Sequence, residues 1–321
     1  MSRIYDLPFL YRIGKKYVVF IYKNYYNKIT ITGTENIPET GPVIFAPNHL
    51  NALMDDMAVL MFASKKHSTV YLGRADMFKK PLVARFLRFA KIMPAFRIRD
   101  GYENLKKNTE TFDESAEVLK NGHALCIMPE GNQELERKVR PLVKGIFRIA
   151  FTAQNEIGEA KNVTILPVGL DYEHFIRFGK NLTINIGKPI NVSDYINDFN
   201  ENQAKAINEI KDKLKFELNE LTVNLDTVEN YELFELVFNI ITSKAAAEKI
   251  YNATDLFKFR KQTAKSLINI EKHSPEKITK LKDLSNSYLK SCEQLKLNPL
   301  KWFAQQIKLK DLFFKGIYFL I

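Results

Sequence analysis

Short apolar runs alternate with amphipathic stretches from residue 28 to residue 190, and this alternation limits the possible folds more than any other feature of the chain. The runs at 43–45 and 163–170 are apolar except for Thr164, as in strands that a sheet buries on both faces. Residues 53–63 and 81–91 instead place apolar side chains at helical intervals. Strands and helices that alternate with short connections predict a layered α/β domain.

The alternation stops near residue 200, which predicts a chain of three parts. After residue 201 glycine becomes scarce, and helical periodicity runs through 204–221, 231–261 and 274–295. We therefore predict an α/β fold in which helices flank a layered mixed sheet over residues 28–200. An N-terminal interfacial helix over residues 1–27 precedes this domain, and a helical appendage with an apolar end follows it over residues 201–321.

Charge and cysteine content narrow the possible partners. The chain has 48 Lys and Arg against 37 Asp and Glu, a net charge of +11, which favours an anionic partner. The basic residues are concentrated beside aromatics at the termini and form no nucleic-acid recognition motif, so we expect no nucleic-acid partner. Cys126 and Cys292 lie far apart without metal-like spacing, which predicts a reducing compartment and neither a disulfide framework nor a zinc site.

The N-terminal segment mixes aromatic and basic residues on one predicted helix. One helical face combines apolar side chains with basic ones at its margins: Phe9, Arg12, Ile13, Lys16, Tyr17 and Phe20. Such a helix can lie in the interface of an anionic membrane, with its lysines near the lipid head groups. It can equally pack against its own domain, and this segment alone does not decide between the two.

The C-terminal end is also basic and apolar. Residues 258–321 hold fourteen Lys and Arg against five Asp and Glu, and 312–321 are mostly apolar. Ten residues are too few to span a bilayer. They fit an interfacial anchor, the first half of a spanning segment, or a helix docked on the protein. Positive charge before an apolar segment predicts the cytoplasmic face of a membrane.

A polar turn follows the predicted strand at 43–45. His49 stands at the end of that strand, and Asp55 follows six positions later at the start of the next helix. A histidine and a carboxylate placed in this way are typical of a general base and the group that orients it. The alternative is a turn in which Asp55 or Asp56 only caps the helix.

Two further polar groups follow apolar strands. Arg97 and Arg99 come directly after a short strand, where a guanidinium group can bind phosphate oxygens in pairs; the alternative is surface ion pairing. Glu130 and Gly131 follow the strand at 124–128. The carboxylate can accept a hydrogen bond from a substrate hydroxyl, and the glycine allows close approach of the backbone. The alternative for this pair is an ordinary turn at the strand's end.

Four blocks in this order resemble the glycerolipid acyltransferase superfamily: Asn-His-(x5)-Asp, Pro-Ala-Phe-Arg, Pro-Glu-Gly and Leu-Pro-Val-Gly. The resemblance covers residues 30–190 and is specific because all four blocks occur in sequence. Five residues separate His49 from Asp55 where most of the superfamily has four. That spacing, with Asn51 shortly after the histidine, is similar to the glycerol-3-phosphate/dihydroxyacetone-phosphate acyltransferase branch. Asn132 stands where Ser or Thr often follows the glycine, which leaves acceptor recognition open.

The resemblance implies a membrane-associated O-acyltransferase of phospholipid biosynthesis. His49, oriented by Asp55, would take the proton from an acceptor hydroxyl that attacks an acyl thioester. Arg97 would bind the acceptor phosphate. Further candidates for substrate binding are Asn48, Arg99, Glu130, Gly131 and Lys144. Acyl-CoA or acyl carrier protein would supply the acyl group as a co-substrate, with no bound cofactor and no metal.

The acceptor predicted first is glycerol-3-phosphate or dihydroxyacetone phosphate. The alternatives are an acyltransferase for lysophosphatidate or another lysophospholipid, and a non-catalytic lipid-binding membrane tether. An intact His49 and Asp55 favour catalysis over tethering.

Overall fold

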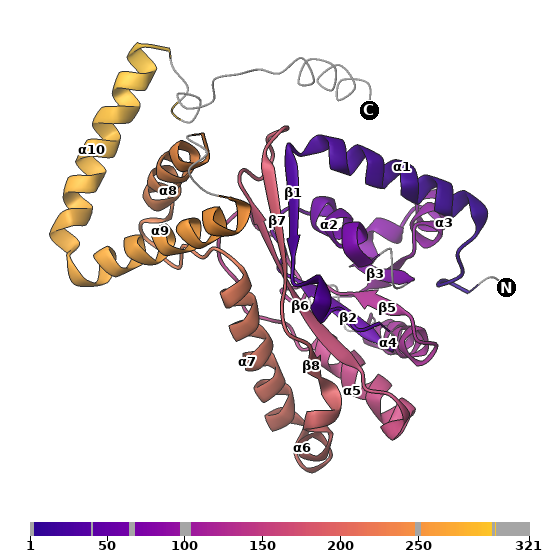
Figure 1. Ribbon diagram of the computed structural model, residues 1–321. Helices are drawn as coiled ribbons and strands as arrows, with labels where there is room; N and C mark the ends of the chain where they lie inside the picture. The colour runs from indigo at the N-terminus through magenta and orange to yellow at the C-terminus, as the bar shows by residue number, and fades with distance from the viewer. Residues whose placement is uncertain are drawn as a thin grey trace.

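A single mixed sheet forms the centre of the computed structural model, which describes residues 3–39, 41–63, 68–96, 104–247, 252–296 and 299 (Figure 1). Its strands lie in the order β1-β7-β6-β2-β5-β3-β4, and β8 pairs with β6. The strands are β1 Lys28–Thr32, β2 Val43–Pro47, β3 Thr69–Arg74, β4 Ile92–Ala95, β5 Ala124–Cys126, β6 Thr164–Tyr172, β7 Asn181–Ile186 and β8 Ile190–Asn191.

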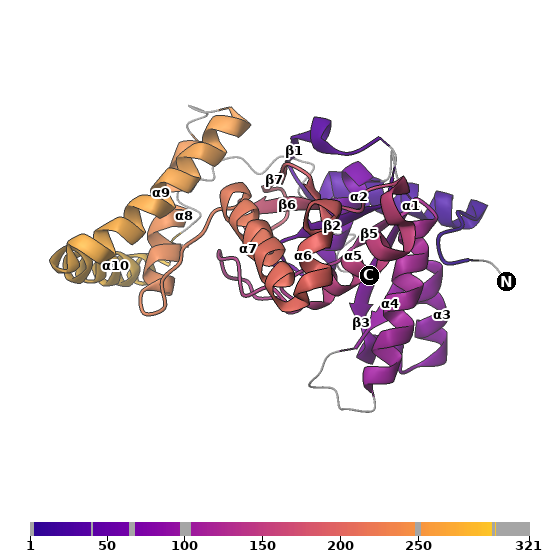
Figure 2. The same ribbon diagram turned by 90° about the horizontal axis from the view of Figure 1, so that it is seen from below.

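Helices cover both faces of this sheet, as Figure 2 shows from below. The described helices are α1 Phe9–Tyr25, α2 Leu53–Ala63, α3 Pro81–Phe89, α4 Asn104–Lys120, α5 Gly145–Ile157, α6 Ile196–Glu201, α7 Gln203–Leu221, α8 Tyr231–Ala247, α9 Ala253–His273 and α10 Pro275–Gln294. Within the described chain, none of them combines the length and hydrophobicity needed to cross a bilayer.

The alternation of side chains along the strands produces two hydrophobic cores. Ile44 and Ala46 of β2 belong to one core with residues of α4, α5 and α7, whereas Val43 and Phe45 belong to the other with residues of α1 and α2. Successive strand residues face opposite sides, so a fully apolar strand serves both cores. The predicted α/β fold with a mixed sheet flanked by helices is confirmed.

The strand directions bring the sequence blocks to one edge. β2 is parallel to both β5 and β6, and β3 is parallel to both β4 and β5. Phe45 lies opposite Cys126 on one side and Leu166 on the other. β7 runs antiparallel to β6 and makes the sheet mixed. Because the carboxyl ends of parallel strands meet at one edge, the segments after β2, β4 and β5 begin there.

The helical region differs from the prediction in two respects. We predicted one helical run over 231–261, whereas the structure has two helices, α8 and α9. The Asn252 side chain accepts a hydrogen bond from Asp255 N at 2.9 Å and caps the start of α9. Phe234 and Phe238 of α8 pack with residues of α9 and α10 in a third core.

The second difference is the position of α7, which we predicted to begin the appendage. Its residues Ile210, Leu214 and Leu218 lie in the same core as α4 and α5. Near its carboxyl end, Leu221 O would be 2.2 Å from a Cβ added to Gly169 of β6. By packing, α7 therefore belongs with the sheet, and the appendage consists of α8, α9 and α10, which lie together at one side of the molecule (Figure 1).

Gly169→Ala tests this close approach. A methyl group there would meet backbone atoms of Leu221 that cannot move independently, so we expect the free energy of unfolding to fall by about 3 kcal/mol. Urea unfolding followed by circular dichroism measures the change. Gly14→Ala is the control, because a Cβ at this position of α1 meets no atom within 4 Å; it should leave stability unchanged or raise it by up to about 1 kcal/mol. Equal stability of the two variants would contradict the close approach.

Candidate active site

The turn between β2 and α2 folds around one carboxylate. Asp55 lies in the first turn of α2 with its side chain fully buried. Its Oδ2 atom accepts hydrogen bonds from the backbone N–H groups of Leu50 at 2.8 Å and Asn51 at 2.7 Å, and lies 2.9 Å from His49 Nδ1. The carboxylate therefore fixes the turn that precedes α2 and also contacts His49, whereas the amides that it binds, Leu50 N and Asn51 N, lie before the helix and not in its first turn.

A tyrosine that we did not single out in the sequence completes this arrangement. The Tyr172 hydroxyl donates to Asp55 Oδ1 at 2.6 Å, and the tyrosine is fully buried at the end of β6. Burial, and then the Asp55 charge, raise the pKa of Tyr172 well above its ordinary value of 10, so the phenol remains a donor. Spacing gives no signal for this contact, because it exists only where β6 lies beside β2.

Helix α1 also contacts this turn. The buried Tyr22 hydroxyl donates to Met54 O at 2.9 Å, one residue before Asp55. Tyr22 and Tyr26 belong to the same core as Phe45 of β2. The N-terminal helix is thus attached to the start of α2 by a specific hydrogen bond as well as by packing.

The His49 ring is placed to exchange protons with a bound molecule. Its side chain is 17% exposed. When Nδ1–H donates to Asp55, the lone pair is on Nε2, and no described residue hydrogen-bonds to Nε2. An imidazole held in one tautomer by a buried carboxylate, with its second nitrogen accessible, can act as a general base.

The backbone of His49 is fixed from the segment after β5. Glu130 Oε1 accepts a hydrogen bond from His49 N at 3.0 Å, and Glu130 Oε2 accepts one from Arg140 Nε at 2.7 Å. Arg140 Nη2 donates to His49 O at 2.5 Å. Burial raises the pKa of Glu130, and the hydrogen bonds from His49 N and Arg140 oppose that shift. Arg140, which sequence reasoning missed, thus links the carboxylate to the histidine.

The polar atoms of Glu130 and Asn48, which we predicted to bind substrate, form hydrogen bonds within the protein. The Glu130 side chain is fully buried, and both of its oxygens accept from protein donors. The Asn48 amide donates to Leu170 O at 3.2 Å and accepts from Leu170 N at 2.6 Å, which joins the end of β2 to β6. Both residues therefore satisfy buried polar groups near the end of β2, and Glu130 also holds the backbone of His49.

Comparison with known proteins finds an acyltransferase domain in this chain. A family model described as Acyltransferase matches residues 28–171, the segment that contains the β2–α2 turn and the Glu130–Arg140 pair. Residues 28–171 therefore form an acyltransferase domain, and the chain is similar to the glycerolipid acyltransferase superfamily. The described part of its acyltransferase domain therefore includes the sheet edge that bears His49, Asp55 and Glu130.

Two curated relatives are both named as 1-acyl-sn-glycerol-3-phosphate acyltransferases. The chloroplastic 1-acyl-sn-glycerol-3-phosphate acyltransferase of Arabidopsis thaliana is 26% identical over 170 residues, which are 52% of this chain and 44% of that protein. The 1-acyl-sn-glycerol-3-phosphate acyltransferase of Borreliella burgdorferi is 26% identical over 160 residues, 50% of this chain and 57% of that protein. The chain thus spans about half the length of the curated relatives it matches.

A solved structure is also similar. The crystal structure of the 1-acyl-sn-glycerophosphate acyltransferase of Thermotoga maritima aligns with a TM-score of 0.44 and 22% identity. The alignment covers 65% of this chain and 82% of that one.

Four predicted site residues remain: Gly131, Lys144, Arg97 and Arg99. Gly131 has a φ of +65°, and a Cβ there would lie 3.1 Å from Val143 Cγ1, so the turn itself favours glycine. Lys144 is exposed and directly precedes α5. Arg97 and Arg99 follow the end of β4 in the sequence but lie outside the described residues.

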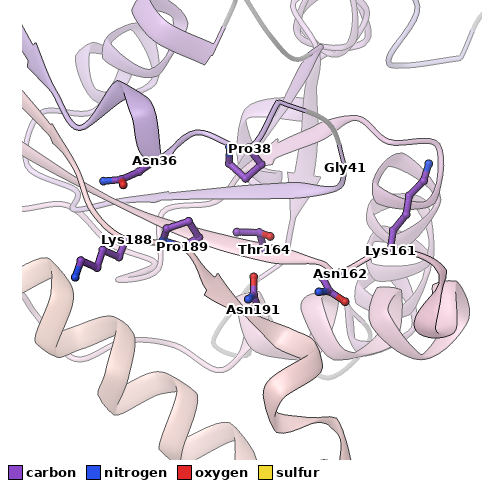
Figure 3. Close-up of a pocket in the computed structure, with 9 residues that line it drawn as sticks. All are labelled: Asn36, Pro38, Gly41, Lys161, Asn162, Thr164, Lys188, Pro189 and Asn191. Carbon is purple, nitrogen blue, oxygen red and sulfur yellow. The ribbon is translucent and has the colours of Figure 1, made fainter.

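One hollow lies near the amino end of β6, at the opposite end of the parallel strands from His49. It has a volume of about 730 Å³, and it is lined by Lys161, Thr164 at the start of β6, Lys188 and Asn191 among others. Figure 3 shows the two lysines on either side of Thr164 and Asn191. Thr164 begins β6, whereas His49 follows the carboxyl end of the parallel strand β2. We therefore do not assign this hollow to the candidate active site.

Asp56 is a second carboxylate beside the pair. It is half-buried on α2. Burial raises the pKa of Asp56 to about 7, the His49 charge opposes this shift, and Asp55 adds to it. Folding thus disfavours the ionised form, and the contribution of this group to stability is lost as pH rises from about 4 through 7.

Asp56→Asn should therefore stabilise the protein at pH 8 and have much less effect at pH 4. We expect the melting temperature to rise by at least about 2 °C at pH 8, measured by differential scanning fluorimetry across this pH range. Asp212→Asn, at an exposed position of α7, is the control and should show no such pH dependence. A difference between wild type and Asp56→Asn that stays constant with pH would rule out this assignment.

Proposed function

We propose that this chain transfers a fatty acyl group from an acyl thioester to the free hydroxyl of 1-acyl-sn-glycerol-3-phosphate, a lysophosphatidate. The contact of 2.9 Å between His49 Nδ1 and the buried Asp55 carboxylate, within an acyltransferase domain, is the observation that carries this proposal. The names of the two curated relatives favour this acceptor, one of our alternatives, over glycerol-3-phosphate or dihydroxyacetone phosphate, which the sequence analysis placed first.

The proposed reaction needs one proton relay. His49 Nε2 takes the proton of the acceptor hydroxyl while the oxygen attacks the thioester carbonyl carbon, and the tetrahedral intermediate then expels the thiolate. The imidazolium returns its proton to the departing sulfur, so the products are an ester and a free thiol. Asp55 remains ionised and stabilises the imidazolium through its Oδ2 contact. The acceptor is itself the nucleophile, so no acyl-enzyme forms.

Substrate contacts follow from the resemblance and remain proposals. Arg97 is our candidate for the acceptor phosphate, with Arg99 and Lys144 as further cations near the ends of β4 and the start of α5. The donor is acyl-CoA or an acyl thioester of acyl carrier protein. Glu130 acts in this proposal by holding the histidine and Asn48 by holding the end of β2, because protein partners occupy their polar atoms.

Incubation with an acyl-CoA and each candidate acceptor tests the activity directly. We expect phosphatidate from lysophosphatidate, identified by mass, and a loss of about a thousandfold in rate for His49→Ala, because the general base is removed. His273→Ala, on the exposed end of α9, is the control and should retain the rate. Turnover by His49→Ala at the wild-type rate would contradict the mechanism, and product from glycerol-3-phosphate alone would restore the acceptor that we predicted first.

An apolar surface beside the site supports membrane association. Helices α1 and α3 meet at Tyr11 and Phe89, whose ring centroids lie 6.2 Å apart in an edge-to-face arrangement. Phe9 is 75% exposed and Leu82 is 83% exposed. More than half of the exposed large apolar side chains in the described chain lie in residues 7–89: Leu7, Phe9, Leu10, Ile13, Tyr17, Phe20, Ile21, Leu53, Met77, Leu82, Val83, Phe86 and Phe89.

The charges around this surface fit an anionic bilayer. Neither α1 nor α3 contains an acidic residue. Exposed basic side chains border the apolar residues: Arg12, Lys16, Lys23, Lys79, Lys80 and Arg85. Apolar side chains that insert between lipid head groups, with cations at their margins, bind anionic interfaces through both burial and charge. We propose that this surface contacts the membrane from which a lipid acceptor comes.

The cytoplasmic face, predicted from the basic C-terminal segment, stays a prediction, since residues 300–321 lie outside the described chain.

Phe86→Ser should weaken binding to vesicles that contain phosphatidylserine by about thirtyfold, because burial of a phenylalanine side chain contributes roughly 2 kcal/mol. Co-sedimentation at two salt concentrations measures the binding, and higher salt should reduce it. Phe216→Ser is the matched control: Phe216 is also well exposed, but it lies on α7. Equal losses for the two variants would mean that α3 does not contact the bilayer.

A further inference from the structure

The two carboxylate oxygens of Asp55 accept hydrogen bonds from different parts of the fold. Oδ2 accepts from the local turn through Leu50 N and Asn51 N and lies beside His49 Nδ1. Oδ1 accepts from the Tyr172 hydroxyl, 117 positions away on β6. A hydrogen bond to a carboxylate withdraws part of the charge that the carboxylate offers its other partners. The strength of the contact with His49 therefore depends on where β6 places Tyr172.

Two arginines fix the end of β6. Arg260 of α9 donates from Nη2 to Tyr172 O at 3.0 Å, and Arg137 from Nη1 to the same carbonyl at 2.8 Å. Arg260 also pairs with Asp171 through Nε at 2.9 Å and Nη2 at 3.1 Å, and Arg137 pairs with Asp171 at 3.2 Å. Asp171 and Tyr172 are adjacent, so the backbone of the tyrosine is held on the face opposite to its side chain.

The cluster pairs two positive side chains with two negative ones in a largely buried place. Arg137, Asp171 and Arg260 are all buried, and Glu235 of α8 lies 3.3 Å from Arg137 Nε. Both guanidinium groups also lie about 5 Å from the Phe238 ring of α8. A buried ion pair adds little net stability, but it fixes geometry because each charge needs its partner in place. The appendage thereby sets the position of the β6 end.

We propose that α9 positions the His49–Asp55 pair, with Arg260 fixing the end of β6 and the Tyr172 hydroxyl acting as the positioning group on Asp55. The role assigned to the pair rests on the proposed function. The helical appendage then helps to support the active site, although it lies outside the family-matched segment. In the described chain its link to Asp55 runs through the end of β6 and Tyr172, not through a direct hydrogen bond to His49 or Asp55.

The test follows the His49 imidazole by ¹⁵N NMR in the full chain as pH is varied. Tyr172→Phe removes the donor to Oδ1, so Asp55 attracts the imidazolium proton more strongly and the His49 titration midpoint should move up by about one pH unit. Tyr71→Phe is the matched control. Tyr71 is buried in the same core, and its hydroxyl has no hydrogen-bond partner in the described chain. Its removal should leave the midpoint unchanged. The other ionisable groups near His49 are Asp56, Glu130 and Arg140, and all variants retain them.

Arg260→Lys tests the longer link. It keeps the charge but loses the planar fork, so the midpoint should move in the same direction by a smaller amount in the wild-type background. In a Tyr172→Phe background it should add nothing, because the connecting hydroxyl is absent. If Arg260→Lys does not fold, Arg260→Gln replaces it, since a glutamine amide can still donate to the Tyr172 carbonyl but cannot form the ion pair with Asp171.

Two outcomes would overturn the proposal. One is an unchanged midpoint in Tyr172→Phe, and the other is an arginine effect of equal size with and without the hydroxyl. The NMR result needs no turnover, so a chain that fails to acylate lysophosphatidate would refute the proposed function without deciding this test. Where turnover occurs, Tyr172→Phe should lower kcat about tenfold with little change in KM, whereas Tyr71→Phe should change neither.

Discussion

The buried carboxylate of Asp55 is the group on which the rest of the site depends. Four donors converge on its two oxygens: two backbone amides of the preceding turn, the His49 ring and the Tyr172 hydroxyl. A fully buried charge is tolerated in a folded protein only when its hydrogen-bonding capacity is used, so this convergence fixes the turn as well as the ring. The same interactions that allow the charge to be buried also select one tautomer of the histidine.

The local part of this arrangement could be predicted from the sequence. His49 and Asp55 lie six positions apart across a strand–turn–helix unit, and the contacts within such a unit depend on spacing that is visible in the chain. The sequence also predicted that His49, Arg97 and Glu130 each follow a strand, and parallel strands bring their carboxyl ends together at one edge of the sheet. Family resemblance and hydrophobic pattern pointed to the same α/β domain.

What could not be predicted depends on contacts between distant segments. Tyr172 reaches Asp55 because β6 lies next to β2, and Arg140 reaches His49 from an irregular segment with no periodic pattern. Glu130 and Asn48 stand in the blocks that carry the family resemblance, yet the sequence does not show whether such a residue meets substrate or braces another residue. Helix α3 shows the same ambiguity. Its apolar stripe predicted an amphipathic helix, but the stripe does not reveal that Leu82 and Phe86 lie exposed while Leu87 is buried.

The hydrogen bond from Tyr22 to the carbonyl of Met54 has a consequence for how a lipid reaches the base. The helix with the exposed Phe9 and Phe20 side chains is hydrogen-bonded directly to the residue before Asp55. On the proposed bilayer, the height of the imidazole above the head groups is then set by the fold and is the same in every encounter. An acceptor whose hydroxyl lies at that depth can meet the base while its acyl chain remains among its neighbours.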